Sequence, residues 1–274
     1  MSDTHSNGSV IEAFSVAKSP DESKNEDGLF INEHFIAVVD GTTSKIPALY
    51  SGKTGGQLLK DAVIDALGKL TGSENHVEAI SFIQKNILET KRFYQIDYAA
   101  ASAIIYSKRL KQIWSVGDCR ALIDSVEFCT KHGIDDILAE VRSYTIRALL
   151  KQGYTVEQLR KNDLGRQMIF PALCNQRLFE NSEEKYGYFV LNTDEPPKDP
   201  SVITSVYPVR SGQEIVLASD GYPVLKNTLA QSEKALEEII TKDPLLYDVF
   251  LATKGVAEGN LSFDDRTYVR FTVN

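Results

Sequence analysis

The chain has 274 residues, of which 42% are apolar, so it is long enough to bury a sizeable core and is neither disordered nor collagen-like. Thirty Lys and Arg against 38 Asp and Glu leave a formal charge of −8. This charge argues against a long contact with a nucleic-acid backbone or an anionic membrane, and it favours a cleft that gathers cations. The 3 cysteines are odd in number and show no C-x-x-C spacing, which indicates reduced thiols rather than a disulfide framework or a zinc site.

The start of the chain carries no visible targeting segment. Residues 1–8 are polar and lack the basic start and apolar stretch of a signal peptide. No run approaches the roughly 18 apolar residues that span a bilayer. We therefore expect a cytoplasmic protein without a membrane or nucleic-acid partner, and we expect a monomer.

Short apolar stretches rich in β-branched and aromatic residues predict the strands. In chain order they lie at 11–16, 35–39, 98–107, 111–116, 120–123, 186–191, 214–218 and 266–273. Several follow one another after turns of only a few residues, so antiparallel meanders are expected rather than parallel βαβ crossovers.

Apolar residues at helical spacing predict the helices. They lie at 57–70, 77–94, 228–241 and 245–255, and a longer helical region from 134 to 162 breaks near Gly153. Strands at both ends of the chain with helices between them predict an α+β fold, in which one domain of packed sheets is flanked by helices. The region at about 134–180 is expected to form a flap or insert on this domain.

Aspartates recur at the ends of these predicted strands. Asp40 and Asp220 each follow an apolar stretch and precede glycine, Asp118 follows a glycine, and Asp264 stands just before the last strand. Each Asp-Gly pair alone is foremost a turn signal, but recurrence at four strand ends favours a shared site. Converging carboxylates cannot all stay ionised without cations, and a set of oxygen ligands favours Mg²⁺ or Mn²⁺ over zinc.

Five sequence blocks follow one another along nearly the whole chain: NEDG at 25–28, AVVDG at 37–41, WSVGDCRA at 114–121, VLASDG at 216–221 and FDDRT at 263–267. In content and order they resemble the metal-dependent protein serine/threonine phosphatases of the PPM or PP2C type. The resemblance implies a four-layer α-β-β-α sandwich, in which two antiparallel sheets carry a two-metal centre at one edge.

The resemblance also implies a set of ligands for two or three Mg²⁺ or Mn²⁺ ions. They are Asp40 as the bridge, Gly41 through its carbonyl, Glu26 or Asp27, Asp220 and Asp264, with Asp118 at a third and weaker ion. The sequence leaves open which member of the Glu26 and Asp27 pair coordinates directly and which acts through water.

The implied reaction is hydrolysis of phosphoserine and phosphothreonine in a phosphoprotein partner, by direct attack of a metal-bridging water. The absence of a C-x5-R loop agrees with a reaction that needs no phosphoenzyme. Asp40, Asp220 and Lys18 are the expected catalytic residues. Lys18 is the preferred cationic partner for the phosphate, with Lys24 as the alternative.

The chain departs from the family pattern in several places, three of which bear on the chemistry. Residues 42–44 read TTS where the family continues with His or Met and glycines, no Arg stands at the usual phosphate-binding place, and no Asp-His pair follows Asp118. His132 is a candidate proton donor. Two alternatives therefore stay open, a pseudophosphatase that binds partners without turnover and a phosphatase of a small phosphorylated metabolite.

Four arginines occur in the region expected to form the insert, at positions 142, 147, 160 and 166. Their positive charge suits an acidic or phosphorylated partner. The other interpretation is that they lie on the solvated faces of amphipathic helices.

Overall fold

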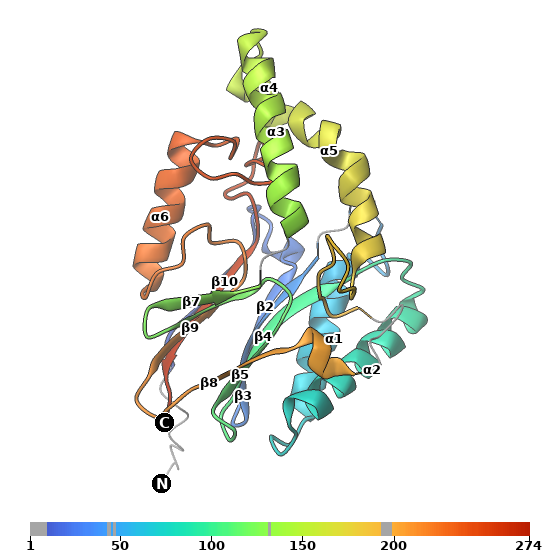
Figure 1. Cartoon of the computed structure of the whole chain (residues 1–274), viewed down its shortest axis with the longest axis vertical. Helices are drawn as coiled ribbons and strands as arrows, with labels where there is room; N and C mark the ends of the chain where they lie inside the picture. The colour runs from blue at the N-terminus through green and yellow to red at the C-terminus, as the bar shows by residue number, and fades with distance from the viewer. Residues whose placement is uncertain (1–9, 43–44, 46–47, 131–132, 193–198) are drawn as a thin grey trace.

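The computed structural model describes residues 10–42, 45, 48–130, 133–192 and 199–274. Two five-stranded antiparallel sheets stack face to face at its centre (Figure 1). One sheet has the order β1 (Val10–Val16), β10 (Arg266–Thr272), β9 (Glu214–Ala218), β6 (Arg120–Ile123) and β7 (Val126–Cys129). The other has the order β2 (Asp27–Ile31), β3 (Phe35–Gly41), β4 (Ala101–Ser107), β5 (Gln112–Val116) and β8 (Ser205–Pro208).

Helices cover the outer faces of both sheets. Helices α1 (Gly55–Lys69) and α2 (His76–Tyr94) lie against the sheet that contains β3, and α6 (Leu229–Lys242) lies beside the sheet that contains β9 (Figure 1). Thr54 begins α1 and Asn75 begins α2, each through a capping box. The expected α+β sandwich of four layers is confirmed.

Strand β3 shows how the core fixes the position of a charged residue. Ile36 and Val38 point into the space between the two sheets, whereas Phe35 and Val39 point toward α1 and α2. Because both faces of the strand are covered, the sequence is apolar without interruption until Asp40. The first carboxylate of the strand therefore lies where the chain leaves the core.

The helical part of the chain that follows β7 projects from one end of the sandwich (Figure 1). It contains α3 (Gly133–Lys151), α4 (Val156–Lys161), α5 (Leu164–Asn175) and the short η2 (Gln176–Phe179). The predicted break near Gly153 is confirmed, because this glycine adopts φ +97° directly after α3. That the segment acts as a flap stays a prediction.

Two predicted elements are wrong. Residues 186–191 form no strand and make only isolated bridges, such as the one between Leu191 and Ala101. Residues 245–255 form no helix, because side chains replace the backbone partners that a helix would supply. Asp243 accepts hydrogen bonds from three consecutive backbone N–H groups. Arg142 donates to the carbonyls of Leu246 and Ala252.

Other elements were missed by the sequence analysis. Strands β7 and β8 lie at sheet edges and have only 4 residues each, so their periodic signal is weak. Helix α5 contains Pro171, which argues against a helix, yet Asp163 caps its start by accepting from the Arg166 N–H at 2.7 Å.

Among the described residues, no helix has both the length and the apolar character required to cross a membrane. The remaining 3₁₀ turns are η1 (Glu22–Lys24) and η3 (Pro200–Ile203).

Candidate active site

Two predicted acids face each other on neighbouring strands. The antiparallel register of β2 and β3 places Asp27 opposite Asp40, and the register of β3 and β4 places Asp40 opposite Ser102. Like charges at opposing positions of a sheet repel each other. The fold therefore holds two carboxylates together at one sheet edge at an electrostatic cost.

Hydroxyl groups orient the acids around this edge. The Ser219 hydroxyl, at the end of β9, donates to Asp27 Oδ2 at 2.5 Å and accepts from the Thr267 N–H at 2.9 Å. The Ser102 hydroxyl donates to Asp118 Oδ1 at 2.7 Å. Both sheets thus contribute to one polar cluster, because Ser219 directly follows β9 of the first sheet and Asp27 begins β2 of the second.

The acids act on one another electrostatically. Burial raises the pKa of Asp40 well above its usual range, and the charges of Asp27 and Asp220 raise it further. Burial also raises the pKa of Asp220 to about 7, to which the charge of Asp264 contributes. Asp118 adds to the pKa shifts of both residues. The strand-end carboxylates that the sequence singled out therefore share one site.

Asp264 has a different surrounding, which contains two lysines. Its carboxylate pairs with Lys18, at 3.3 Å, and with Lys254. Burial alone would raise the pKa of Asp264, but Lys254 and Lys18 outweigh it and lower the pKa to about 2. Asp264 thus pairs with two ammonium groups, and the charge of Lys254 also opposes the rise in the pKa of Asp220 without cancelling it.

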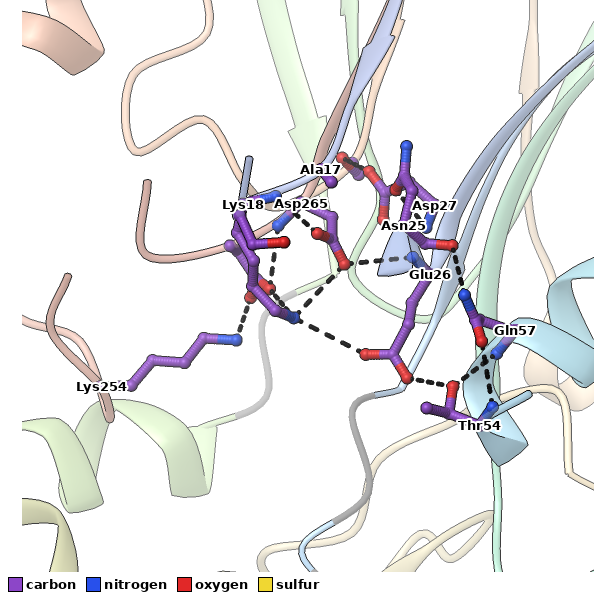
Figure 2. A network of polar contacts seen from close by, with 12 residues as sticks. Ala17, Lys18, Asn25, Glu26, Asp27, Thr54, Gln57, Lys254 and Asp265 are labelled. Atoms are coloured by element: carbon purple, nitrogen blue, oxygen red, sulfur yellow. Dashed lines mark hydrogen bonds and ion pairs between the residues drawn. The ribbon is translucent and has the colours of Figure 1, made fainter. Parts of the chain in front are cut away.

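The adjacent Asp265 organises the chain around Lys18 (Figure 2). It is 3% exposed, and it accepts from the backbone N–H of Lys18 at 2.7 Å and from that of Glu26 at 3.2 Å. The Lys18 ammonium group also contacts Asp265 Oδ2, at 3.3 Å. Asp265 therefore ties the end of β1 to the start of β2, a role that the sequence analysis did not assign to it.

Glu26 and Asp27 point to different neighbours. Glu26 accepts from the Thr54 hydroxyl at 2.6 Å and lies 3.6 Å from Lys18, so it faces the start of α1 (Figure 2). The carboxylate of Asp27 lies instead among the other acids, whose charges contribute to raising its pKa after burial. The two residues that sequence alone could not distinguish therefore occupy different environments.

A close approach of backbone segments positions Gly41, whose carbonyl was the other expected ligand. A Cβ atom at Gly41 would lie 2.2 Å from the Gly56 carbonyl oxygen, so only glycine allows α1 to begin this close to the end of β3. Gly56 in turn leaves room for Glu26 Oε1.

A cavity of about 330 Å³ opens beside the acids. Its lining includes the strand-end residues Asp40, Asp118, Asp220 and Asp264. The projecting segment contributes Asp135 and Asp136 from α3 and Leu173 from α5, and the loop before Asp264 contributes Lys254. The projecting segment therefore forms one wall of the candidate active site.

The donor set suits a hard divalent ion. Oxygen atoms dominate it, and Asp220 Oδ1 is a buried carboxylate oxygen with no hydrogen-bond partner in the described part of the chain. However, among the residues that the structure describes, no three His, Cys, Asp or Glu side chains are already grouped to hold a metal. The chemistry of the residues thus fits Mg²⁺ or Mn²⁺, while the contacts of Asp264 with lysines would have to change.

Not every predicted site residue reaches this cluster. Lys18 contacts carboxylates but is not among the residues that line the main cavity. Lys24 is mostly exposed and pairs with Asp21 at 3.6 Å. His132 and residues 43–44 lie outside the described residues, so the proposed proton donor stays a prediction.

A hydrogen-bonded group on the cavity wall was missed. Glu180 accepts from Tyr98, from Tyr188 at 3.2 Å and from Asn192 at 2.5 Å. Burial raises the pKa of Tyr188, and the charge of Glu180 raises it further. No sequence pattern marks this group, because its members are spread over separate loops.

The comparisons with known proteins concern the fold. No protein-family model and no curated protein matches the sequence. Solved structures of PP2C-type serine/threonine phosphatases are similar over nearly the whole chain. The catalytic domain of PstP in complex with 2 manganese ions is 13% identical, with TM-score 0.47 and coverage of 97% of this chain and 99% of that one. PstP/Ppp from Mycobacterium tuberculosis is 14% identical, with TM-score 0.46 and coverage of 97% and 100%. RsbX in complex with magnesium is 15% identical, with TM-score 0.45 and coverage of 97% and 99%.

Proposed function

We propose that this chain is a Mg²⁺- or Mn²⁺-dependent phosphatase that hydrolyses phosphoserine and phosphothreonine in proteins. The observation that carries the proposal is the crowding of Asp40, Asp118 and Asp220 beside one cavity, where one carboxylate oxygen of Asp220 has no hydrogen-bond partner among the described residues. Crowded buried carboxylates are costly unless cations compensate them.

The chain's own residues would divide the work of holding the ions. Asp40 is the best candidate for a bridging ligand, since the charges of several other acids act on it. The Gly41 carbonyl, Asp27, Asp220 and Asp264 would complete the shells, and Asp118 would help to hold a third ion. Glu26 is better suited to an indirect role, because Thr54 and Lys18 already contact its carboxylate.

Divalent ions in such a site activate water for attack on phosphorus and neutralise charge on the phosphoryl oxygens. The serine hydroxyls fix the acids in their orientations: Ser219 holds Asp27 and Ser102 holds Asp118. The cavity of about 330 Å³ gives room for a phosphorylated side chain. A role for Lys18 toward the phosphate stays a prediction.

The test measures phosphate release from a phosphoserine peptide with and without Mn²⁺. We expect Asp40→Asn and Asp220→Asn each to lower kcat by at least about 100-fold, because each removes a ligand for ions on which the reaction depends. Asp65→Asn, on the exposed face of α1, is the matched control and should retain full activity. Mn²⁺-dependent turnover that survives both site substitutions would refute the site assignment.

The lysine contacts of Asp264 favour a second candidate, a binding module that recognises phosphorylated partners without turnover. In that protein Lys18 and Lys254 would compensate Asp264 permanently. Metal titration separates the two candidates. Tight Mn²⁺ binding that is lost in Asp40→Asn supports the enzyme, and a protein that binds phosphopeptide but no Mn²⁺ is the non-catalytic module.

A further inference from the structure

Lysine side chains stand beside the acids in the same cavity. Lys45 and Lys254 both line it, together with Asp40, Asp220 and Asp264. Burial lowers the pKa of Lys45, and the positive charge of Lys254 lowers it further, which indicates that the two ammonium groups act on one another. A cationic subsite therefore adjoins the acidic one.

The backbone before Lys254 is held by arginines from the projecting segment. Arg142 of α3 donates to the Ala252 carbonyl at 3.0 Å, and Arg166 of α5 donates to the Thr253 carbonyl at 2.8 Å. Arg142 is fully buried and is itself fixed by Asp163. These tertiary contacts fix the position of Lys254, although the loop around it has no regular secondary structure.

The arginines nearest the cavity are engaged with protein groups. Arg120, which also lines the cavity, is held by Glu127 and by the Tyr222 carbonyl. Arg166 is directed to the Thr253 carbonyl. Lys254 forms an ion pair with Asp264, and its side chain is 25% exposed.

We propose that Lys254, assisted by Lys45, binds the phosphoryl group of the substrate in this cavity. The inference rests on the proposed function and adds the residue that supplies the missing cationic partner. A divalent ion bound to Asp264 would replace Lys254 as the positive charge beside this carboxylate. The Lys254 ammonium group would then be available to donate hydrogen bonds to phosphoryl oxygens. Lys18 keeps two other carboxylates, Glu26 and Asp265, and is therefore less easily released.

Inorganic phosphate is the probe, because it is the product of the reaction and needs no knowledge of the natural substrate. Calorimetric titration of the Mn²⁺-loaded protein should show that Lys254→Met weakens phosphate binding at least about 10-fold and that Lys254→Arg retains most of it. Electron paramagnetic resonance of Mn²⁺ should show that both variants still bind the metal at least as well as the wild type. Lys234→Met, an exposed lysine on α6, changes the net charge equally and should bind phosphate like the wild type.

A wild-type experiment guards against a variant that fails to fold. Amine acetylation followed by mass spectrometry should show that phosphate protects Lys254 in the Mn²⁺-loaded protein, while Lys234 is modified equally with and without phosphate. Wild-type phosphate affinity in Lys254→Met, or no protection of Lys254, overturns the inference.

Activity measurements separate this inference from the proposed function. A raised KM for a phosphopeptide in Lys254→Met, with a smaller change in kcat, supports both the role of Lys254 and the phosphatase function. Normal Mn²⁺-dependent turnover in that variant overturns the Lys254 assignment and leaves the phosphatase standing. Phosphate binding through Lys254 in a wild-type protein without turnover upholds the subsite and refutes the phosphatase.

Discussion

Asp27 and Asp40 lie directly opposite each other on the neighbouring strands β2 and β3. Both are buried enough for their pKa values to rise well above the usual range, and each raises the energy of ionising the other. The strand pairing is fixed by the apolar residues that precede Asp40 and follow Asp27, so the carboxylates cannot separate without loss of sheet register. The two carboxylates consequently repel each other unless a bound cation compensates their charge.

The first prediction concerns the stability of this pair. Asp27→Asn keeps an oxygen that can accept from Ser219 but removes one charge, so the metal-free variant should be more stable than the wild type by about 1 kcal/mol. Its stabilisation by added Mn²⁺ should fall sharply. Thermal unfolding with a chelator and with Mn²⁺ measures both effects, and a variant that unfolds earlier than the wild type in chelator contradicts the prediction.

The second prediction is a pH dependence. The folded-state pKa of Asp220, about 7, lies above its unfolded value of 3.8, so the folded metal-free protein binds the proton more tightly. Ionised Asp220 destabilises the folded protein. This effect is absent below pH 3.8 and fully present above pH 7. Urea unfolding in chelator should therefore show stability falling by about 3 kcal/mol between about pH 4 and pH 7. Asp220→Asn should flatten this decline, and an equal slope in the variant would assign the effect elsewhere.

The third prediction concerns the fully buried Arg142. Arg142→Met should destabilise the protein by about 3 kcal/mol or more, because it removes the guanidinium that donates to Asp163 Oδ2 and to two backbone carbonyl groups. Arg147→Met is the matched control on the same helix. Its guanidinium is 51% exposed and pairs with Asp248 at the surface, so the loss of stability should be much smaller than for Arg142→Met. Urea denaturation compares the two variants, and equal losses would show that burial does not distinguish them.

The fourth prediction concerns the contact between β3 and α1. Gly41→Ala should destabilise the protein by about 2 kcal/mol or more and weaken Mn²⁺ binding, because the new Cβ would lie 2.2 Å from the Gly56 carbonyl oxygen. Gly68→Ala, near the end of the same α1, meets nothing closer than Phe30 at 3.9 Å. This control should raise stability by about 0.5 kcal/mol through helix propensity. Thermal unfolding tests both, and a tolerated Gly41→Ala would remove the argument for close packing at the site.

The arginines of the projecting segment illustrate how tertiary structure can replace a sequence-based interpretation. Sequence spacing suggested either an acidic partner or solvated helix faces. In the structure, Arg142, Arg160 and Arg166 donate to backbone carbonyls in the loop that follows α6. Neither interpretation foresaw this use, because the loop lies about a hundred residues farther along the chain and carries no pattern that marks it as a partner.

The sequence by itself determined the layers and the strand-end acids. Apolar periodicity sets which faces are buried, and a charged residue at the end of a buried strand such as β3 has to lie at the sheet edge. Only the tertiary structure decided how those acids are compensated and which cation faces the cavity. Asp264 acquires Lys18 and Lys254 as neighbours, and Lys254 is placed by hydrogen bonds from helices of the projecting segment. Such contacts join residues that are distant in the chain, and their geometry depends on side-chain packing that local sequence patterns do not encode.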